Sequence, residues 1–564
     1  MSERDIIFEK YFSPRCLRLA WERMIRSNGK DIKDFFGIEI FSSNLEKNLT
    51  RLSDLLLSGQ YEPQRPFKYF EPKASRTHRT KSVLYVEDAL VYQAIANNIA
   101  TTNFHRLFEN NGFVFGSVLH PEVELGLSIL DNPDAEFYFF EYYIPLYNRF
   151  INSVNTEIEN TEIRYKLETD ITGFFDSIPH SKLLITFKKF GVEPVILDLL
   201  SDCLNIFSGT KESITPGVGI PQGPAASFFF ANVFLSDLDY EISQKGYTYY
   251  RYMDDIRIYE EEEKQLTEAL VLIDNFLKSR ALSLNTKKTS IEEIVDREAE
   301  KLPFLRFSGG ETDYYQSNLD KDKNKNAEIY LTEQSPDNDQ GKKYIIKSIN
   351  GKELISYCRK EISEVERILF EKFKDINSPE FNPRSLSNDE NLKKDIIHIA
   401  YRWRNSNSIL KVIDAPVLNN KLIDIWLFCT EYFFWKANHF CWNLNQYGPN
   451  VHITSELDKI LNQFISYEWV RYQILSNMAM VQNFSPSDLK KIFRETKREP
   501  SGLVRLGYYI ILLRHLKPSS QLFSSLRLAI KDDKEPYIKR SLVGHLNKLS
   551  GNEKVEEIKY WFGL

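Results

Sequence analysis

The segment from residue 251 to residue 259 constrains this chain most, because two runs of strand-forming residues meet there at a pair of aspartates. It reads Arg-Tyr-Met-Asp-Asp-Ile-Arg-Ile-Tyr, and tyrosine and isoleucine favour β-strands. Asp254 and Asp255 therefore fall at the tip of a predicted hairpin, where aspartate tolerates turn geometry. The two carboxylates repel each other unless a cation lies between them. This feature alone is compatible with a solvated turn and with a site for a hard divalent cation such as Mg²⁺.

A third acidic position precedes the hairpin, in the segment Leu167–Ile178. Asp170 ends a predicted strand there, before a turn with two phenylalanines, and it can face the Asp254–Asp255 pair across a sheet. Two Mg²⁺ ions roughly 3.5–4 Å apart need bridging carboxylates from separate strands. One ion would activate a 3′-hydroxyl, and the other would neutralise a triphosphate and its leaving pyrophosphate.

A loop rich in glycine and proline, Pro216–Pro224, lies between these acidic elements and precedes a helical run that reaches Asp239. Its glycines and prolines favour a turn that another group can approach closely, and the start of the helix can face a nucleotide. A simple turn before a helix is the alternative.

Composition bounds the class of protein. The length of 564 residues predicts about three or four domains, and the 42% hydrophobic content excludes wholesale disorder. A net charge of −6 means that any nucleic acid must bind in a local positive channel. The five cysteines form no metal-binding pattern, which is typical of reduced thiols in the cytoplasm. We expect a cytoplasmic protein that does not enter a membrane, because no apolar stretch is long enough to span one.

The distribution of residue types predicts an α+β fold with three parts. Residues 1–310 mix strands and helices and contain the motifs above, so they are the predicted catalytic unit. Residues 311–394 begin with a strongly polar stretch and are the predicted linker and connecting region. Residues 395–564 are helical in pattern and rich in large aromatic residues, and a helical-repeat array is one reading of them.

The order of these motifs resembles that of the reverse transcriptases. The runs that begin at Asp170, Gly219 and Tyr252 are similar to motifs A, B and C of that family, and Leu284–Thr289 is similar to motif D. Upstream, Pro72-Lys73 with Arg79 resembles the fingers motif that grips the incoming triphosphate. The resemblance covers about residues 50–310. It implies a right-hand polymerase core of fingers and palm, a thumb-like connection, and an all-α C-terminal domain.

The resemblance also implies a metal site. Asp170 and Asp254 would be the metal-ligating catalytic residues, Asp255 would support them, and Ile171 would complete the site. The implied cofactor is a pair of Mg²⁺ ions, for which Mn²⁺ can substitute.

Further residues would contact the nucleotide and the primer. Phe175 would lie under the sugar and exclude a 2′-hydroxyl by its size, which favours deoxynucleotides. Gln222 would line the nucleotide pocket, and Met253 would touch the primer end. Lys73 and Arg79 would bind phosphates, the arginine in a forked geometry and the lysine as a point charge.

Lys288 is the candidate proton donor to pyrophosphate, and Lys287 is the second choice. For Lys288, Lys73 and Arg79 the alternative interpretation is a solvated surface charge. For Phe175 the alternative is an aromatic residue of the core.

Departures from the usual reverse transcriptase motifs limit the subgroup of that family that this chain resembles. The motif E region, Phe304–Phe307, lacks the Leu-Gly of many relatives, and no zinc-binding or HNH-like signature follows it. The long helical C-terminal half resembles the abortive-infection and defence-associated bacterial enzymes such as AbiK and AbiA. In that group some members polymerise DNA without a template from a protein hydroxyl, and some form oligomers.

We therefore expect a nucleotidyltransferase, either an RNA-directed or a template-independent DNA polymerase, that acts in anti-phage defence. Its expected partners are deoxynucleoside triphosphates, an RNA template or non-coding RNA, a DNA product that can be attached to the protein, and further copies of the chain. The alternatives are a retron-like templated reverse transcriptase and a catalytically idle, RNA-binding oligomeric scaffold.

Overall fold

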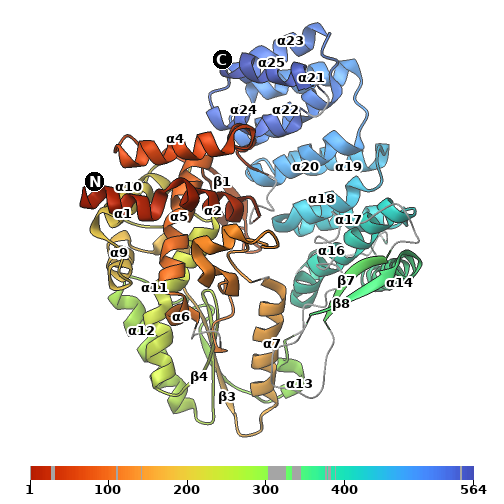
Figure 1. Ribbon diagram of the computed structural model, residues 1–564. Helices are drawn as coiled ribbons and strands as arrows, with labels where there is room; N and C mark the ends of the chain where they lie inside the picture. Colours follow the sequence, from red (N-terminus) through yellow and green to blue (C-terminus); the bar gives the residue numbers. More distant parts are fainter. Residues whose placement is uncertain are drawn as a thin grey trace. The chain divides into compact units, whose positions relative to one another are not determined.

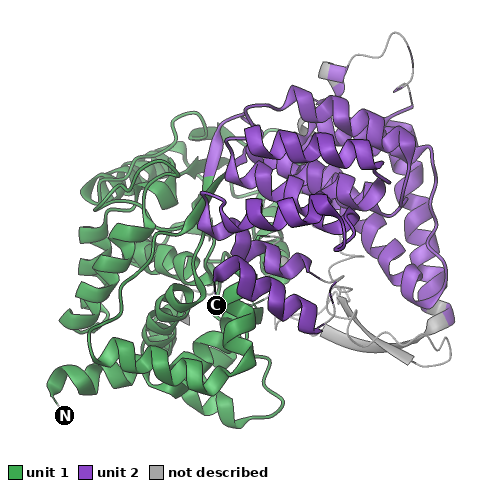
Figure 2. Cartoon of the chain, turned by 90° about the horizontal axis from the view of Figure 1, so that it is seen from above, with its two compact units in different colours: residues 1–69, 80–305 green, residues 70–79, 306–564 purple. Residues whose placement is uncertain are grey.

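The computed structural model divides into two compact units, which are described separately (Figure 2). The first comprises residues 1–69 and 80–305, and the second comprises residues 70–79 and 306–564. The structure describes residues 2–26, 32–108, 112–141, 143–302, 326–332, 344–374, 376, 378, 383–387, 389–546, 549 and 551–563.

A four-stranded antiparallel sheet with the order β4-β5-β3-β6 organises the first unit. The strands are β3 (Tyr165–Asp170), β4 (Thr248–Tyr252), β5 (Asp255–Glu260) and β6 (Ser290–Glu293). Side chains alternate between the two faces of a strand, so Leu167, Ile256 and Ile258 are buried on one face, while Asp170, Asp255 and Arg257 belong to the other. A second, two-stranded sheet consists of β1 (Phe67–Pro72) and β2 (His78–Val83).

Helices form most of the rest of the first unit (Figure 1). They are α1 (Glu3–Phe12), α2 (Pro14–Arg26), α3 (Phe35–Ser43), α4 (Leu45–Leu57), α5 (Val86–Thr102), α6 (Phe104–Phe108), η2 (Pro121–Asp131), α7 (Tyr143–Glu159), α8 (Phe174–Ser177), α9 (His180–Lys189), α10 (Pro194–Phe207), α11 (Ala225–Gln244), α12 (Glu263–Ser279) and α13 (Arg297–Glu300).

The core of the first unit lies between the sheet and its central helices. Helices α5 and α11 are buried on most of their surface, as expected for helices that are apolar on nearly all sides. They join α9, α10 and α12 in one hydrophobic cluster with Leu167, Ile256 and Ile258. On the opposite face of the sheet, Phe150 of α7 packs in a smaller cluster with Tyr259. The carboxylate-bearing face is therefore the one that α7 covers in part.

The second unit is mainly helical. Its described elements are β7 (Asn326–Thr332), β8 (Tyr344–Asn350), α14 (Gly351–Lys372), α15 (Pro383–Ser387), α16 (Glu390–Ile413), α17 (Leu422–Tyr432), η4 (Phe434–Lys436), α18 (Ala437–Asn445), α19 (Val451–Gln463), α20 (Glu468–Val481), α21 (Pro486–Arg498), α22 (Gly502–His515), α23 (Gln521–Lys531), α24 (Pro536–Leu542), η5 (Val543–His545) and α25 (Gly551–Phe562). This content is consistent with the expected all-α C-terminal part.

Alternate helices of the second unit are neighbours. Helix α14 packs against α16, α16 against α18, α18 against α20, and α20 against α22, which is the pattern of stacked helix pairs. The stretch that the sequence predicts as a polar linker differs, because its described residues include the antiparallel pair β7–β8. Within the described part of the chain, no helix combines the length and apolar character needed to cross a membrane.

Candidate active site

The hairpin that the sequence predicts around the paired aspartates is present. Strands β4 and β5 pair with Tyr252 opposite Asp255, so Met253 and Asp254 form the two-residue turn. Met253 has a φ of +56°, a left-handed conformation that a methionine adopts only when its surroundings impose it. The first carboxylate therefore lies in the turn itself, and the second begins the next strand.

The register of β3 brings the third carboxylate to the same end of the sheet. Asp170 is directly opposite Asp255 in the antiparallel pairing of β3 with β5. Like charges in directly opposed positions destabilise a sheet. This pairing concentrates negative charge where both strands end, next to the turn that holds Asp254.

Burial and mutual repulsion disfavour the ionised forms of the hairpin carboxyls. The pKa of Asp254 is raised above its usual value by burial and then by the charges of Asp170 and Asp255. Burial also raises the pKa of Asp255, against the opposing effect of the Arg257 guanidinium. The site is thus an arrangement of carboxylates that lacks sufficient positive charge of its own.

Two cationic side chains partly offset this charge. Lys288 Nζ donates a hydrogen bond to Asp170 Oδ2 at 2.8 Å, and its side chain is 61% exposed. Arg257 Nη1 donates to Glu168 Oε1 at 2.8 Å, and its Nε lies 3.5 Å from Asp255 Oδ1. The predicted motif D is therefore at the site, and Lys288 rather than Lys287 provides the ion pair with Asp170.

The segment that carries Lys288 is fixed to the end of β3 by backbone contacts. Asn285 N–H donates to the Asp170 carbonyl at 2.7 Å, and Ile171 forms an isolated antiparallel bridge with Leu284. Asn285 Nδ2 also donates to Asp170 Oδ1, at 3.5 Å. These contacts hold Lys288 beside Asp170 even though its side chain is solvent-exposed.

The chemistry of the site fits hard divalent cations. Among the residues that the structure describes, no group of three or more His, Cys, Asp or Glu side chains is already arranged to hold a metal ion. The three aspartates nevertheless supply only oxygen ligands, which Mg²⁺ prefers, and their mutual repulsion would fall when a cation binds. The exposed Lys288 can move away from Asp170 without loss of buried packing.

The connection between motifs A and B positions Phe175. Gly173, with a φ of +54°, turns the chain from β3 into α8, and Ile220 N–H then donates to the Phe175 carbonyl at 2.8 Å. The Phe175 ring is 7% exposed and lies 5.2 Å from the ring of Phe228, edge to face. Phe174 is buried more deeply in the same core. Contact of Phe175 with a sugar stays a prediction.

Gln222 lines a cavity of about 230 Å³ together with Lys68, Asp176 and several hydroxyl-bearing residues. Its Oε1 is buried and has no hydrogen-bond partner among the described residues, while its carbonyl accepts from Ser82 N–H at 2.9 Å. Burial lowers the pKa of Lys68 to about 8, and its Nζ donates to the Gly209 carbonyl at 2.7 Å. An orphaned acceptor next to a polar cavity is suited to a ligand that donates a hydrogen bond.

The predicted phosphate-binding residues belong to the second unit, so their position relative to the aspartates is not described. Lys73 lies in the turn between β1 and β2, and Arg79 is the second residue of β2. Arg79 Nη1 is 3.7 Å from Glu71 Oε2, and the Arg79 side chain is 42% exposed. The predicted motif E segment, Phe304–Phe307, lies outside the described residues.

Sequence reasoning missed the arginine that supports the catalytic turn. Arg251 is 1% exposed and forms a forked pair with Asp239 of α11, with N–O distances of 2.8 and 2.6 Å. Its Nη1 also donates to Asn232 Oδ1 and to the Met253 carbonyl, at 2.9 and 2.8 Å. Burial acts to lower the pKa of Arg251, but Asp239 and Tyr249 together outweigh burial and raise it. The alternation of side chains along the strand was the sequence signal that could have revealed this role, because it puts Arg251 on the buried face with Tyr249.

Gly116 is needed where the backbone of the catalytic turn approaches it. A Cβ at this position would lie 2.6 Å from the Met253 nitrogen, which no real Cβ tolerates. The segment is held there because Asn232 Nδ2 donates to the Gly116 carbonyl at 2.7 Å and Phe115 N–H donates to the Arg251 carbonyl at 2.9 Å. The Met253 turn is thus enclosed by Gly116 and Arg251.

Neutralising Asp254 is expected to stabilise the metal-free fold. Because its pKa is raised, the native state holds this proton more tightly than the unfolded chain, and stability falls as the pH rises above the ordinary value of 3.8. Asp254→Asn removes the unfavourable buried charge, and a substitution of this kind commonly raises the free energy of unfolding by about 0.5–2 kcal/mol. Mg²⁺ should raise the Tm of the wild type and leave that of the variant nearly unchanged. Calorimetry at pH 7 measures both effects, and a wild-type Tm that is indifferent to Mg²⁺ would contradict the metal assignment.

Comparison with known proteins identifies the class of the domain that contains these residues. Residues 129–316 match the family described as "Reverse transcriptase (RNA-dependent DNA polymerase)". A segment of the chain is 28% identical over 142 residues to the retron Ec86 reverse transcriptase of Escherichia coli. That match covers 24% of this chain and 41% of the retron enzyme, so the chain spans about two fifths of that relative's length. Residues 129–316 are therefore similar to a reverse transcriptase domain, and this similarity supports a nucleotidyltransferase.

Solved structures with weak overall similarity include two telomerases. One is from Candida albicans, in complex with a TWJ fragment of telomeric RNA, with a TM-score of 0.30, 12% identity, and coverage of 76% of this chain and 68% of that chain. The other is apo telomerase from Candida tropicalis, with a TM-score of 0.31, 12% identity, and coverage of 73% and 69%.

Proposed function

We propose that this protein is a DNA polymerase of the reverse transcriptase type, which adds deoxynucleotides to a 3′-hydroxyl. The observation that carries the proposal is the register of β3 and β5, which sets Asp170 opposite Asp255 beside the Asp254 turn, inside the region that matches the reverse transcriptase family. In this proposal residues 1–310 are the fingers and palm of a right-hand polymerase, and they include the hairpin tip at residues 70–79 that belongs to the second unit.

Asp170, Ile171, Asp254 and Asp255 would hold two Mg²⁺ ions. The bound ions would supply Lewis-acid activation of the 3′-hydroxyl and neutralisation of the triphosphate. Arg257 holds the Asp255 carboxylate in place. The other contributions come from the nucleotide-binding residues that the sequence predicts.

Lys288, once displaced from Asp170 by a cation, would donate a proton to the leaving pyrophosphate. Phe175 and Gln222 would enclose the sugar and the base side of the nucleotide, and Lys73 and Arg79 would bind its phosphates. The Met253 turn would support the primer end, since Arg251 and Gly116 fix its backbone.

Replacement of Phe175 by a smaller residue is expected to relax the choice of sugar. Phe175→Val removes the ring that would collide with a 2′-hydroxyl, so the preference for dNTP over rNTP should fall by about 10- to 200-fold, the range of one steric contact in a pocket. The matched control is Phe174→Val, which removes an equally large neighbouring ring from the core. The ratio of kcat/KM for dTTP and UTP is the measurement. Equal selectivity in wild type and Phe175→Val would show that Phe175 is only a core residue.

We further propose that the polymerase acts in bacterial anti-phage defence, in the cytoplasm, as an oligomer, and either with an RNA template or without one. Support comes from the long helical C-terminal part, which resembles that of abortive-infection enzymes. A retron-like templated reaction is the second candidate, and the 28% identical segment favours it.

The test of this proposal separates the two modes of synthesis. Nuclease-treated protein is given Mg²⁺ and each labelled deoxynucleotide singly, with and without a primed RNA, and the products are resolved before and after protease digestion. Product that requires the added RNA supports templated synthesis. Product that forms without RNA and leaves the protein only after proteolysis supports protein-primed, untemplated synthesis. Absence of any product under all conditions would contradict the polymerase proposal and favour an idle RNA-binding scaffold.

A further inference from the structure

The tip of the β1–β2 hairpin, residues 70–79, belongs to the helical unit rather than to the unit that contains the aspartates (Figure 2). Aromatic rings join the tip to the helices. The His78 ring lies 5.5 Å from that of Phe70 and 5.3 Å from that of Tyr467, and Tyr467 in turn lies 5.0 Å from Phe434. Contacts at these distances are typical of stabilising aromatic pairs. The tip is therefore anchored by the residue that precedes α20.

A hydrogen bond from the same tyrosine reaches the backbone of the turn that contains Lys73. Tyr467 Oη donates to the Arg76 carbonyl at 3.2 Å. Arg76 has a φ of +66°, and its N–H donates to the Lys73 carbonyl at 2.9 Å, while Lys73 N–H donates to the Thr77 carbonyl at 2.8 Å. A non-glycine residue holds such a conformation only when its surroundings fix it. The contact from Tyr467 thus stabilises the turn conformation around Lys73.

The next residue in the chain, Glu468, holds the strand that enters the turn. Phe70 N–H donates to Glu468 Oε1 at 3.3 Å, and Ser501 Oγ donates to Glu468 Oε2 at 2.5 Å. A carboxylate in the first turn of α20 is also favoured by the helix dipole. Glu468 therefore connects the hairpin to the loop before α22.

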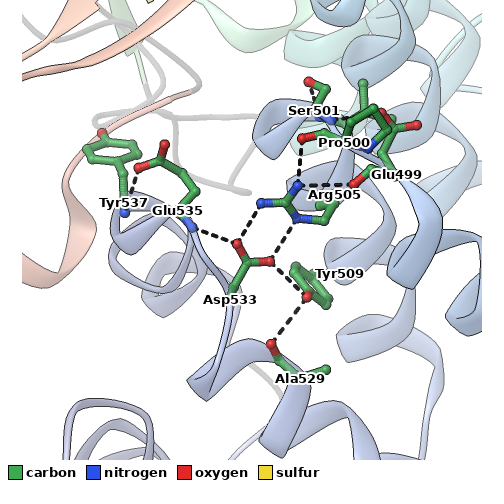
Figure 3. A network of polar contacts seen from close by, with 10 residues as sticks. Glu499, Pro500, Ser501, Arg505, Tyr509, Ala529, Asp533, Glu535 and Tyr537 are labelled. Atoms are coloured by element: carbon green, nitrogen blue, oxygen red, sulfur yellow. Dashed lines mark hydrogen bonds and ion pairs between the residues drawn. The ribbon is translucent and has the colours of Figure 1, made fainter. Parts of the chain in front are cut away.

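That loop is held by a network of partly buried polar contacts (Figure 3). Ser501 N–H donates to Glu499 Oε1 at 3.0 Å, and Arg505 Nη1 donates to the carbonyls of Glu499 and Pro500 at 3.1 and 2.8 Å. Arg505 pairs in turn with Asp533, which is 4% exposed, at 2.7 Å. The network fixes the position of Ser501 and so of the carboxylate that holds Phe70.

The charges beside the hairpin are also shared with the helical unit. Arg79 pairs with Glu71. Burial lowers the pKa of Lys436, the Glu71 carboxylate opposes this shift, and the Arg79 guanidinium adds to it. Lys436, at the start of α18, and Arg79 are therefore close to the same carboxylate. The helical unit contributes to the electrostatic surroundings of a residue that the proposed function assigns to the triphosphate.

We propose that Tyr467 and Glu468 are positioning residues for the nucleotide: they hold the hairpin that carries Lys73 and Arg79 in the conformation that binds a triphosphate. The C-terminal helices then set the affinity for the incoming nucleotide through this hairpin. This inference rests on the proposed function, because it takes Lys73 and Arg79 as the phosphate-binding residues.

The test uses the full chain and two conservative variants, Tyr467→Phe and Glu468→Gln. The first removes the hydroxyl that reaches the Arg76 carbonyl and keeps the ring beside His78. The control is Tyr447→Phe, which removes the same kind of contact, from Oη to the Asn419 carbonyl at 2.9 Å, elsewhere in the helical unit. The readouts are KM and kcat for dNTP, and the Kd for a fluorescent dNTP by equilibrium titration.

We expect KM and Kd to rise about 3- to 10-fold in both variants, with kcat within about twofold of the wild type, since one hydrogen bond is lost and the chemistry is unchanged. The control should match the wild type. In an Arg79→Ala background, Tyr467→Phe should have a smaller effect, because the residue it positions is gone. Unchanged KM and Kd in both variants would overturn the inference while the polymerase proposal stands. A wild type that binds dNTP without incorporating it would overturn the polymerase proposal, and the Kd values of the variants would still test the inference. A wild type that neither binds nor incorporates dNTP would overturn both.

Discussion

Asp254→Asn is expected to reduce deoxynucleotide incorporation by at least about a thousandfold, which corresponds to about 4 kcal/mol of transition-state stabilisation. The substitution keeps the size of the side chain and removes the charge that attracts a divalent cation to the turn. Asp170 and Asp255 remain, but with less charge they should hold a cation less tightly. Incorporation of labelled dNTP per enzyme under saturating Mg²⁺ measures the loss.

The matched control for that loss is Asp131→Asn. Asp131 is 69% exposed in an ion pair with Arg15 on the surface of the first unit, so the substitution makes the same chemical change away from the site. It should leave incorporation within about twofold of the wild type. Circular dichroism and thermal melting establish that both variants are folded. Equal activity of Asp254→Asn and the wild type would remove Asp254 from the catalytic set.

Arg251→Met is expected to destabilise the first unit by about 3–5 kcal/mol. Removal of one partner of a buried ion pair leaves the other charge without compensation, and Asp239 is as deeply buried as Arg251. The substitution also removes the donor to the Met253 carbonyl, so the catalytic turn should lose its left-handed conformation in part. Urea unfolding monitored by fluorescence gives the free energy, and incorporation assays on the folded fraction give the effect on the turn.

Two comparisons separate the buried pair from a general effect of charge removal. Arg15→Met breaks an exposed pair of the same kind and should cost less than about 1 kcal/mol. The double variant Arg251→Met/Asp239→Leu replaces both charges by apolar side chains and should recover much of the stability. If Arg251→Met costs no more than Arg15→Met, the buried network does not support the turn.

Local sequence signals were sufficient for the hairpin and its carboxylates. Tyrosine and isoleucine on either side of Asp254-Asp255 left few alternatives to two strands and a tight turn, and β4 and β5 follow that pattern. The position of Asp170 at the end of a strand was also readable, because the motif runs directly into a Phe-Phe turn. Which residue of β5 lies opposite Asp170 was not readable, since register depends on the partner strand.

The residues that support the catalytic turn and the hairpin could not be predicted from the local sequence, because their partners are distant in the chain. Arg251 looked like an ordinary strand residue, and only the packing of α11 against the sheet reveals Asp239 and Asn232 as its partners. In the same way, nothing near Lys73 indicates that its turn contacts Tyr467, almost four hundred residues later. The pair β7–β8 lies in a polar stretch whose composition is that of a linker, so its strands were not predicted.

The most direct test of the central claim is Mg²⁺-dependent incorporation of labelled deoxynucleotides by the purified full chain, with and without primed RNA. The account predicts product that forms with Mg²⁺, stops on addition of EDTA, and is absent with Asp254→Asn. No product with Mg²⁺ or Mn²⁺ under either condition, or the same amount from the wild type and Asp254→Asn, would contradict it.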